Sequence, residues 1–524
     1  MIRREYHNRI NCIFSIPDIF LSSYWLDMGN EKTAIVIGAG IGGITTAVFL
    51  AKNGYQVDVY EKNSAPGGRC GQIIRDGHRF DVGATIYLMP GIYRKVFEAL
   101  GITPEGSFES VPLTTLYTVY FSDGQQVEFT TNKESLKDQL EKIEKGSFEK
   151  SQQLQLEGYR LFQLAIDKLL GRNFYKLFEF ATLKNALLLL KLKTYIRHVV
   201  YIRKFFTSKI LRTVFTFQNI YVGQNPAQAP ALFAMIPAAE LTEGSLFPVG
   251  GMFSITRKLL TMAEELGVRF HYDEPVIKIK IEKDRAAGIV LQNGSVIRTS
   301  VIVANADLPY VYKELLPDTG MAKRLERLQY TCSAIVLHWG LDKRYAELGH
   351  HSVFLSERYS KNLDKIFREQ SLADDPSFYV HAPVKSDPSA APAGQDSLSV
   401  IIPAGHLRNS NNQNWNELKN QARASVIARL KKQGLTDIEE HIKFEICYLP
   451  QTWKSIFNLS RGATFGSLGH SIFQMGYFRP HNRHKRYRNL YFTGGSTHPG
   501  NGIPLVLLSA KLTSERIIKE NPNE

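Results

Sequence analysis

A glycine-rich turn between an apolar strand and a helix constrains the fold of this chain more than any other feature. Residues 33–37 form a β-branched run that suits a buried parallel strand, and a second such run, residues 57–60, follows the helix. The turn matches the pattern G-x-G-x-x-G, and its glycines are Gly38, Gly40 and Gly43. Strand, turn, helix and strand in this order predict a Rossmann-like dinucleotide-binding unit.

The residues of this unit have separate expected roles. Gly38 permits the tight turn, Gly40 lets a pyrophosphate approach the backbone, and Gly43 lets the helix pack closely on the strand. Glu61 ends the second strand, where its carboxylate can hydrogen-bond a ribose hydroxyl. The predicted dinucleotide contacts on this unit are Gly38, Gly40, Gly42, Gly43, Glu61 and Lys62.

The residues that follow indicate FAD rather than a nicotinamide cofactor. Gly68 and Arg69 lie just beyond the second strand, before a small β-rich segment that nicotinamide dehydrogenases lack. An arginine beside glycines can reach a diphosphate through charge-assisted hydrogen bonds, although a surface turn with a solvated arginine is the alternative. The sequence contains no second G-x-G-x-x-G pattern. We therefore expect no separate NAD(P)H site, and we expect oxygen or a quinone to accept the electrons.

A second glycine-rich turn near the C-terminus is almost free of charge. Between residues 493 and 510 the only ionisable side chain is His498. Bare backbone of this kind lets a flat isoalloxazine ring lie against the turn, and a following helix can direct its positive end at a reduced flavin. Proline suits the first turn of that helix. The predicted flavin contacts are Gly494, Gly495, Gly502, Ile503 and Pro504.

With these motifs, the sequence resembles the bacterial and fungal carotenoid desaturases, the phytoene desaturase family. Two further stretches, FPVGGMFSI at 247–255 and VIVANADLP at 301–309, belong to the likeness, which runs from about residue 33 to residue 516. The resemblance implies FAD as the sole redox cofactor, an amine-oxidase-like fold and a C30 or C40 polyene substrate. It also implies that the backbone of Val276 lies against adenine. One departure is Ala84, where the family often has proline.

We expect an α/β protein in which a Rossmann-like FAD-binding domain, of the glutathione-reductase and amine-oxidase type, carries an inserted α+β domain for substrate and membrane. The FAD-binding domain is expected to be discontinuous, with residues 31–100, 245–310 and 485–524. The inserted domain is expected to comprise residues 101–244 and 311–484. Residues 1–30 are interpreted as a disordered leader or as sequence upstream of the true start.

The formal charge of +14 indicates an anionic partner. Residues 160–212 carry much of the excess, and on a single helix residues 176–206 would place most basic side chains opposite an apolar half. Such a helix suits an anionic membrane surface, although a solvated basic face is the alternative. Nucleic acid is not expected, because no nucleic-acid-binding signature accompanies the charge. We expect a peripheral protein on the cytoplasmic side of a membrane.

Catalytic residues are left unknown by the sequence, and no metal site is predicted. Desaturating an allylic CH–CH pair removes a hydride, which a flavin accepts, and a proton from a delocalised carbocation, so little acid–base help is needed. His498 is interpreted as a histidine satisfied by backbone rather than as a base. The charge-free residues 213–239 are read as an apolar tunnel wall, with plain core as the alternative.

The predicted function is FAD-dependent carotenoid desaturation, in particular the conversion of phytoene to lycopene by successive two-electron dehydrogenations. Alternatives within the family are a C30 diapophytoene desaturase, a hydroxycarotenoid 3,4-desaturase and a carotenoid oxygenase. An amine oxidase and a non-catalytic lipid escort with the same fold are alternatives of other classes.

Overall fold

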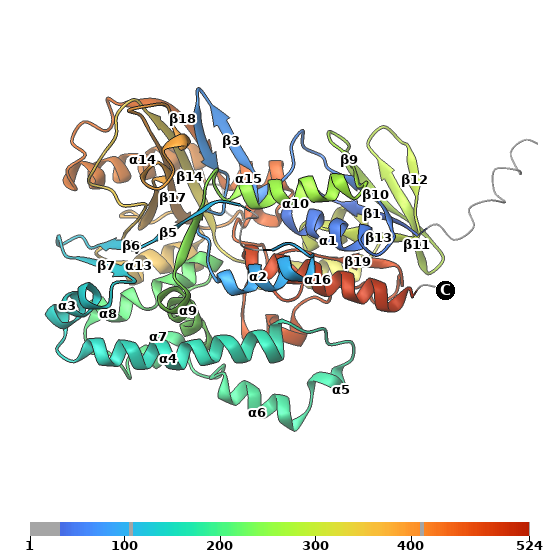
Figure 1. The fold of residues 1–524 in the computed structure, drawn as a ribbon, viewed down its shortest axis with the longest axis horizontal. Coiled ribbons are helices and arrows are strands. Elements are labelled where there is room, and N and C mark those ends of the chain that lie inside the picture. The colour runs from blue at the N-terminus through green and yellow to red at the C-terminus, as the bar shows by residue number, and fades with distance from the viewer. Residues whose placement is uncertain (1–31, 104–107, 409–412, 523–524) are drawn as a thin grey trace, which may run out of the picture.

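The computed structural model describes residues 32–103, 108–408 and 413–522 (Figure 1). The interpretation of residues 1–30 as a leader lies outside the described residues. Among the described residues there are two large sheets, each covered by helices, with a cavity between them. No helix in these ranges is at once long enough and apolar enough to cross a bilayer.

The first sheet is parallel and has the strand order β19-β13-β1-β2-β9. Its strands are β1 (Thr33–Ile37), β2 (Gln56–Tyr60), β9 (Arg269–His271), β13 (Val301–Ala304) and β19 (Leu490–Phe492). These strands come from the three segments that were predicted to build the FAD-binding domain. Parallel neighbours cannot be joined by tight hairpins, so the chain returns to the sheet through helices and through the inserted segments.

Both faces of this sheet are covered, which explains why β1 is apolar throughout. Val36 packs on the side of helices α1 (Ile41–Ala51), α10 (Phe253–Glu265) and α16 (Ile503–Glu520). Ile35 and Ile37 point the other way, against a three-stranded antiparallel sheet. That sheet consists of β10 (Val276–Glu282), β11 (Arg285–Leu291) and β12 (Val296–Arg298).

The second large sheet has the order β18-β14-β17-β16-β15-β6-β7 and is antiparallel except where β15 pairs with β6. Its strands are β6 (Thr115–Tyr120), β7 (Gln126–Thr130), β14 (Ser333–Leu341), β15 (His351–Phe354), β16 (Phe378–His381), β17 (Asp396–Ala404) and β18 (Ile442–Tyr448). Helix α14 (Trp415–Lys432) covers one face (Figure 1). Because side chains alternate along a strand, Ile401 and Tyr379 point to the opposite face, where they line the cavity.

The remaining elements surround these sheets. The short strands pair as β3 (Gln72–Arg75) with β4 (His78–Asp81) and β5 (Ser110–Leu113) with β8 (Ser245–Pro248). The other helices are α2 (Pro90–Ala99), α3 (Lys133–Ile143), α4 (Ser147–Ala165), α5 (Leu177–Phe180), α6 (Leu183–Lys191), α7 (His198–Ile202), α8 (Lys209–Val214), α9 (Met235–Glu243), α11 (Leu308–Tyr310), α12 (Thr319–Glu326), α13 (Tyr359–Asp364) and α15 (Pro450–Phe457).

The single amphipathic helix predicted for residues 176–206 is wrong. Three short helices, α5, α6 and α7, occupy this segment. The turn before α7 is pulled out of helical geometry by tertiary pairing, because the His198 amide donates to the Ala229 carbonyl (2.7 Å) and the Ala231 amide donates to the Ile196 carbonyl (2.8 Å). These bonds join segments that lie thirty residues apart, so the helical periodicity of the segment gives no sign of them.

Candidate active site

A long cavity of about 460 Å³ lies between the two large sheets. This volume is typical of a site that takes a small organic ligand. One end is formed by the two glycine-rich turns, and the other by apolar side chains of the inserted segments. All of the predicted site residues except Gly43 line the cavity. They are Gly38, Gly40, Gly42, Glu61, Lys62, Gly68, Arg69, Val276, Gly494, Gly495, Gly502, Ile503 and Pro504.

The first glycine-rich turn has the shape that its sequence demands. Gly38 has φ +100°, which disfavours any side chain, and a Cβ added to Gly43 would lie 2.1 Å from the Gly38 carbonyl oxygen. Gly43 therefore lets α1 lie close to the turn. Gly40 and Gly42 face the cavity and lie beside Asn305, whose amide would meet an added Cβ at 2.8 and 2.7 Å.

Glu61 is buried at the edge of the cavity and holds the turn. One carboxylate oxygen accepts a hydrogen bond from the Ala39 amide (2.8 Å), and the other accepts from the amide and side chain of Asn63 (2.9 and 2.8 Å). The neighbouring Lys62 points to the rim, where its ammonium donates to the Ser455 carbonyl (2.5 Å) and to Asn458 (2.8 Å). The two adjacent residues thus order different parts of the same wall.

Arg69 brings a half-buried positive charge to the cavity wall. Its guanidinium donates to the Thr464 carbonyl (2.9 Å), and burial lowers its pKa while the charge of Asp307 opposes that shift. Asp307 is itself buried, which raises the pKa of its carboxyl, and it accepts a hydrogen bond from the Ser460 amide (3.0 Å). The sequence analysis includes Asn305 and Asp307 in a motif but does not predict that they are site residues. The signal that could have identified them is their position directly after β13, at the carboxyl edge of the sheet.

The second glycine-rich turn forms an open cradle at the start of α16. Gly502 has φ +89°, and a Cβ added there would meet no protein atom within 4 Å, because the space beside it is the cavity. The N-terminus of α16 faces this space. Arg479, which was not predicted, is fully buried and holds the turn from behind by donating to the carbonyls of Gly495 (2.6 Å) and Thr497 (3.0 Å).

His498 does not act as a free base in this arrangement. Its Nε2 lies 3.1 Å from the Arg172 carbonyl oxygen, and burial lowers its pKa to about 4. The interpretation of a histidine satisfied by backbone agrees with this contact, although the partner comes from a distant segment.

The far part of the cavity is apolar. Residues 213–239 contribute much of its wall, as the tunnel interpretation predicts. Their lining side chains are Phe217, Ile220, Tyr221, Val222, Leu232, Phe233, Met235 and Ile236. Polar side chains on this wall are few, and among them are Thr85, Tyr379 and His470. The arrangement suits a long hydrocarbon that reaches the glycine-rich turns.

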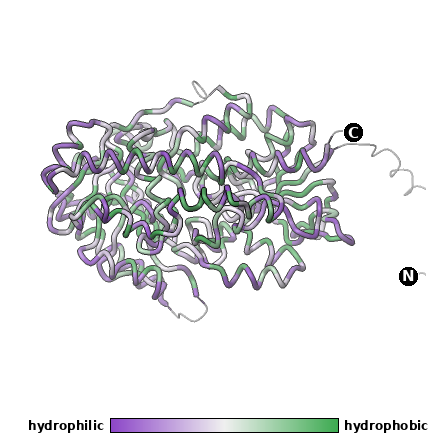
Figure 2. The backbone as a smooth tube through the Cα atoms, turned by 90° about the horizontal axis from the view of Figure 1, so that it is seen from below, coloured by the Kyte–Doolittle hydropathy of each residue, from purple (hydrophilic) through white to green (hydrophobic). Residues whose placement is uncertain are grey.

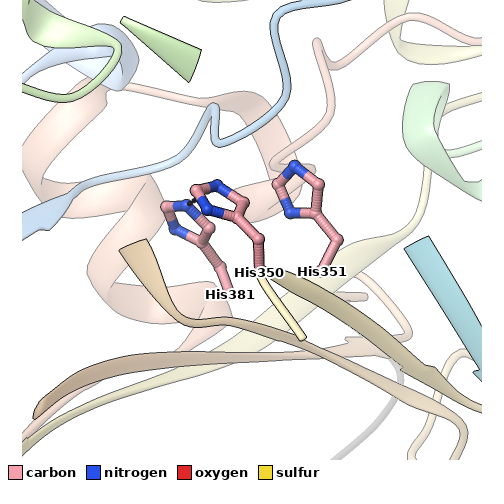
Figure 3. A group of neighbouring side chains, drawn as sticks. All are labelled: His350, His351 and His381. Carbon is pink, nitrogen blue, oxygen red and sulfur yellow. Dashed lines mark hydrogen bonds between the residues drawn. The ribbon is translucent and has the colours of Figure 1, made fainter. Parts of the chain in front are cut away.

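Three histidines that the sequence did not bring together form a buried cluster behind this wall (Figure 3). One ring nitrogen from each of His350, His351 and His381 lies within 4.8 Å of the others. Pairing of β15 with β16 places His351 opposite His381, which residue spacing alone cannot reveal. Burial lowers the pKa of all three imidazoles, so they are neutral at physiological pH.

The cluster is better described as hydrogen-bonded than as a metal centre. Three imidazoles are a donor set that zinc or copper accepts, but Nε2 of His350 and Nε2 of His381 already share a hydrogen bond of 3.2 Å. Neither Nδ1 atom has a partner among the described residues. A cation held through both Nε2 atoms would leave two buried N–H donors without acceptors, which is costly.

Comparisons with known proteins agree with this geometry. The family model described as flavin containing amine oxidoreductase matches residues 41–518. A phytoene desaturase of Fusarium fujikuroi is 36% identical over 94% of this chain and 90% of its own length. A zeta-carotene-forming phytoene desaturase of Myxococcus xanthus is 37% identical over 93% of this chain and 94% of its own. A 4,4'-diapophytoene desaturase of Staphylococcus haemolyticus is 32% identical over 93% and 98%.

The chain belongs to the phytoene desaturase group of the flavin-containing amine oxidoreductases. The fold of this family is also seen in putrescine oxidase bound to putrescine, which matches 94% of this chain and 99% of its own at 15% identity, with a TM-score of 0.60. As a member of the family, the protein uses FAD. Its cavity fits that cofactor, because Arg69 offers a charge to the diphosphate and the bare turn at Gly502 leaves room for a ring.

Proposed function

We propose that this protein is a carotenoid desaturase that converts phytoene to lycopene by successive two-electron dehydrogenations. One observation carries the proposal. A single cavity is lined by a long apolar wall and by the glycine-rich turn at Gly502, where no side chain fills the space. A polyene lying along that wall would present one CH–CH pair at the turn. The names of relatives that form zeta-carotene or act on the C30 analogue make fewer steps and a shorter substrate the closest alternatives.

When bound, FAD supplies the hydride acceptor of the reaction. The residues of this chain supply the rest. Glu61 and Arg69 would hold the dinucleotide end, while the N-terminus of α16 faces the part of the cavity that a ring would occupy and favours negative charge there. The apolar wall excludes water and aligns the hydrocarbon, which is most of what a delocalised carbocation requires. A lipid escort without redox function has no need for Gly502 beside an open cradle.

We further propose that the protein works as a peripheral protein on the cytoplasmic face of an anionic membrane. An apolar surface is formed by exposed side chains of α5, α6 and the segment around residues 472–478. Its members are Leu177, Phe178, Leu183, Leu187, Leu190, Ile472, Phe473 and Phe478. Figure 1 places α5 and α6 at the lower edge of the molecule, and Figure 2 views the molecule from that side.

Ring contacts join the two parts of this apolar surface. Phe180 of α5 lies 5.6 Å from Phe478, and Phe478 lies 6.4 Å from Phe473, measured between ring centroids. Leu169, which lines the cavity, packs close to Gly476 of the same segment. A hydrocarbon dissolved in a bilayer would therefore have a short apolar route from this surface into the cavity.

Pigment analysis tests the proposed function. The protein, reconstituted with FAD, is incubated with phytoene in anionic vesicles, with oxygen or a soluble quinone as electron acceptor. A parallel incubation uses the C30 analogue. We expect lycopene from phytoene, and no consumption of NAD⁺ or NADP⁺. Full flavin occupancy without desaturation of either hydrocarbon would refute the proposal, and products that stop at zeta-carotene or form only from the C30 substrate would select the named alternatives.

A further inference from the structure

A chain of hydrogen bonds leads from the cavity wall to the histidine cluster. The Thr85 hydroxyl lies 3.0 Å from the Tyr379 hydroxyl, and that hydroxyl lies 2.7 Å from Nδ1 of His351. Thr85 and Tyr379 both line the cavity, whereas His351 is buried behind it. Gly83, Ala84 and Thr85, where this chain departs from the family pattern, lie on the same stretch of wall.

The strand geometry fixes the central pair. β15 and β16 are antiparallel, with Val353 opposite Tyr379 and His351 opposite His381. Side chains two residues apart on a strand share a face, so Tyr379 and His351 are diagonal neighbours on the cavity side of the sheet. The His351 ring lies 4.4 Å from that of His350 and 5.4 Å from that of His381, between centroids, and these rings restrict its movement (Figure 3).

The charges of the central pair are settled by burial. Burial, with a contribution from the charge of Asp81, raises the pKa of Tyr379, so the phenol keeps its proton. Burial and the two neighbouring imidazoles lower the pKa of His351, so its ring is neutral. We place the hydrogen of the neutral His351 ring on Nε2. Tyr379 then donates to Nδ1 of His351 and accepts from the Thr85 hydroxyl, and one oxygen lone pair of Tyr379 is left.

A small space adjoins the pair and shares Tyr379 and Tyr221 with the lining of the main cavity. It has a volume of about 10 Å³ and is lined by His351, Tyr379, Tyr221 and Glu240, among others. Such a space is about large enough for one water molecule, and its polar lining offers the partners that a buried water needs. A proton on His351 would have a route onward through this space.

We propose that Tyr379 accepts the proton that the substrate loses during desaturation and passes its own proton to Nδ1 of His351. The inference rests on the proposed desaturase function. One C–H bond of the substrate breaks with loss of hydride to the flavin, which is reduced by two electrons. The neighbouring C–H bond breaks with loss of a proton to the Tyr379 oxygen, and its electron pair forms the new double bond. The Tyr379 proton moves to His351, which becomes an imidazolium.

Neutral and weakly basic groups suffice for this step, because a carbocation beside a polyene is a strong acid. Tyr379 is the catalytic residue in this scheme, since it lines the cavity proposed for the substrate, and His351 acts through it. Tyr120 provides a matched comparison, because it is a buried tyrosine on β6 of the same sheet and lines neither the main cavity nor the small space. Its hydroxyl contacts the Glu347 carbonyl (3.5 Å).

Matched variants test the inference. Tyr379→Phe and His351→Asn should each lower turnover at saturating phytoene roughly 100-fold, because proton acceptance by a positioned group contributes about that much or more. Tyr120→Phe should stay within about twofold of the parent. Flavin content and melting temperature check that each variant folds. A solvent isotope effect on flavin reduction in single anaerobic turnovers should be present in the parent and in Tyr120→Phe, and absent in Tyr379→Phe.

A spectroscopic measurement examines the same bond without turnover. In ¹⁵N-histidine spectra, the His351 resonances are identified as those that disappear in His351→Asn. In the parent protein their chemical shifts should show an Nδ1 atom that carries no hydrogen. Tyr379→Phe should change the chemical shift of that Nδ1 atom. A hydrogen on that Nδ1 atom overturns the inference. Turnover of Tyr379→Phe equal to that of Tyr120→Phe, with the isotope effect retained, also overturns it. A parent protein that desaturates no polyene would instead refute the proposed function, so the two failures are distinguishable.

Discussion

The carboxylate of Glu61 binds the glycine-rich turn through the Ala39 amide, at 2.8 Å. Sequence reasoning assigned Glu61 to the ribose. In the structure the same side chain also fixes this turn, and its second oxygen accepts from the amide and side chain of Asn63. One buried anion therefore orders the loop and lines the cavity at once. The consequence is that cofactor binding depends on both oxygens.

Glu61→Gln should weaken FAD binding about tenfold to hundredfold, since a hydrogen bond to a charged group contributes roughly 1.5–3 kcal/mol. The glutamine side chain has only one acceptor oxygen. Its NH₂ group would therefore face the backbone N–H of Ala39 or of Asn63, and that hydrogen bond would be lost. Flavin titration of the apoprotein measures the dissociation constant. Asp58→Asn is the control, because that carboxylate binds Arg269 and His271 away from the cavity lining. Equal affinities of the two variants would contradict the role given to Glu61.

Gly502→Ala should abolish FAD binding at a small cost in stability. The added Cβ would meet no protein atom within 4 Å but would enter the space proposed for the ring. Gly294→Ala is a close match, because Gly294 has φ +86°, Gly502 has φ +89°, and neither has a neighbour for an added Cβ. Both variants should lose about 1–2 kcal/mol of stability through left-handed backbone strain. Only the first should lose the flavin spectrum, and retention of flavin by Gly502→Ala would place the ring elsewhere.

Because of Glu240, the free energy of unfolding should fall as the pH rises. Its carboxyl is buried with one hydrogen bond, from Tyr117 (3.1 Å), and burial raises its pKa to about 8. A carboxyl whose pKa is raised on folding stabilises the protein fully below its unfolded pKa, and this stabilisation is lost as pH rises through the folded pKa. Between about pH 4.5 and 8 the loss is roughly 1.4 kcal/mol per pH unit.

Glu240→Gln removes this titration. The melting temperature of the variant, relative to that of the parent, should therefore increase steadily from pH 5 to pH 8. A constant difference between Glu240→Gln and the parent across this range would mean that the carboxyl is ionised in the folded protein.

The parts of the fold that could be predicted from sequence are those in which backbone geometry requires a residue type. Gly38 and Gly502 need positive φ, so a glycine pattern reports them directly. Arg479 could not be found in this way, since its partners are carbonyls of the folded turn. The histidine cluster depends on the register of β15 with β16, and the breaks before α7 depend on bonds to residues 229–231. Periodicity reports neither, because both arise from pairing between distant segments.

The structure changes the choice of residues for testing membrane binding. Lys193 is not available to a lipid surface, because its ammonium pairs with Glu157 (2.6 Å) and hydrogen-bonds to Tyr201 (2.9 Å). Lys184, Lys191 and Arg197 remain exposed beside the apolar surface. Each contributes on the order of 1 kcal/mol near an anionic bilayer, and this term is weakened by salt.

Two variants separate the electrostatic and apolar terms of membrane binding. The triple change Lys184→Glu, Lys191→Glu and Arg197→Glu should reduce co-sedimentation with anionic vesicles strongly at low salt. Leu183→Glu with Phe473→Glu should reduce it at both low and high salt, because these side chains are 78% and 75% exposed and insertion of apolar area is not screened. Flavin content should be unchanged, since none of the five residues lines the cavity.

Ile74→Glu is the matched control for the apolar change. Ile74 is 70% exposed on β3, outside the apolar surface, so its replacement adds a charge without touching the proposed contact. Sedimentation of Leu183→Glu with Phe473→Glu at the level of Ile74→Glu, in both salts, would show that α6 and the 472–478 segment do not enter the bilayer. Substrate would then have to reach the cavity by another face, and desaturation of vesicle-borne phytoene by that double variant should match the parent.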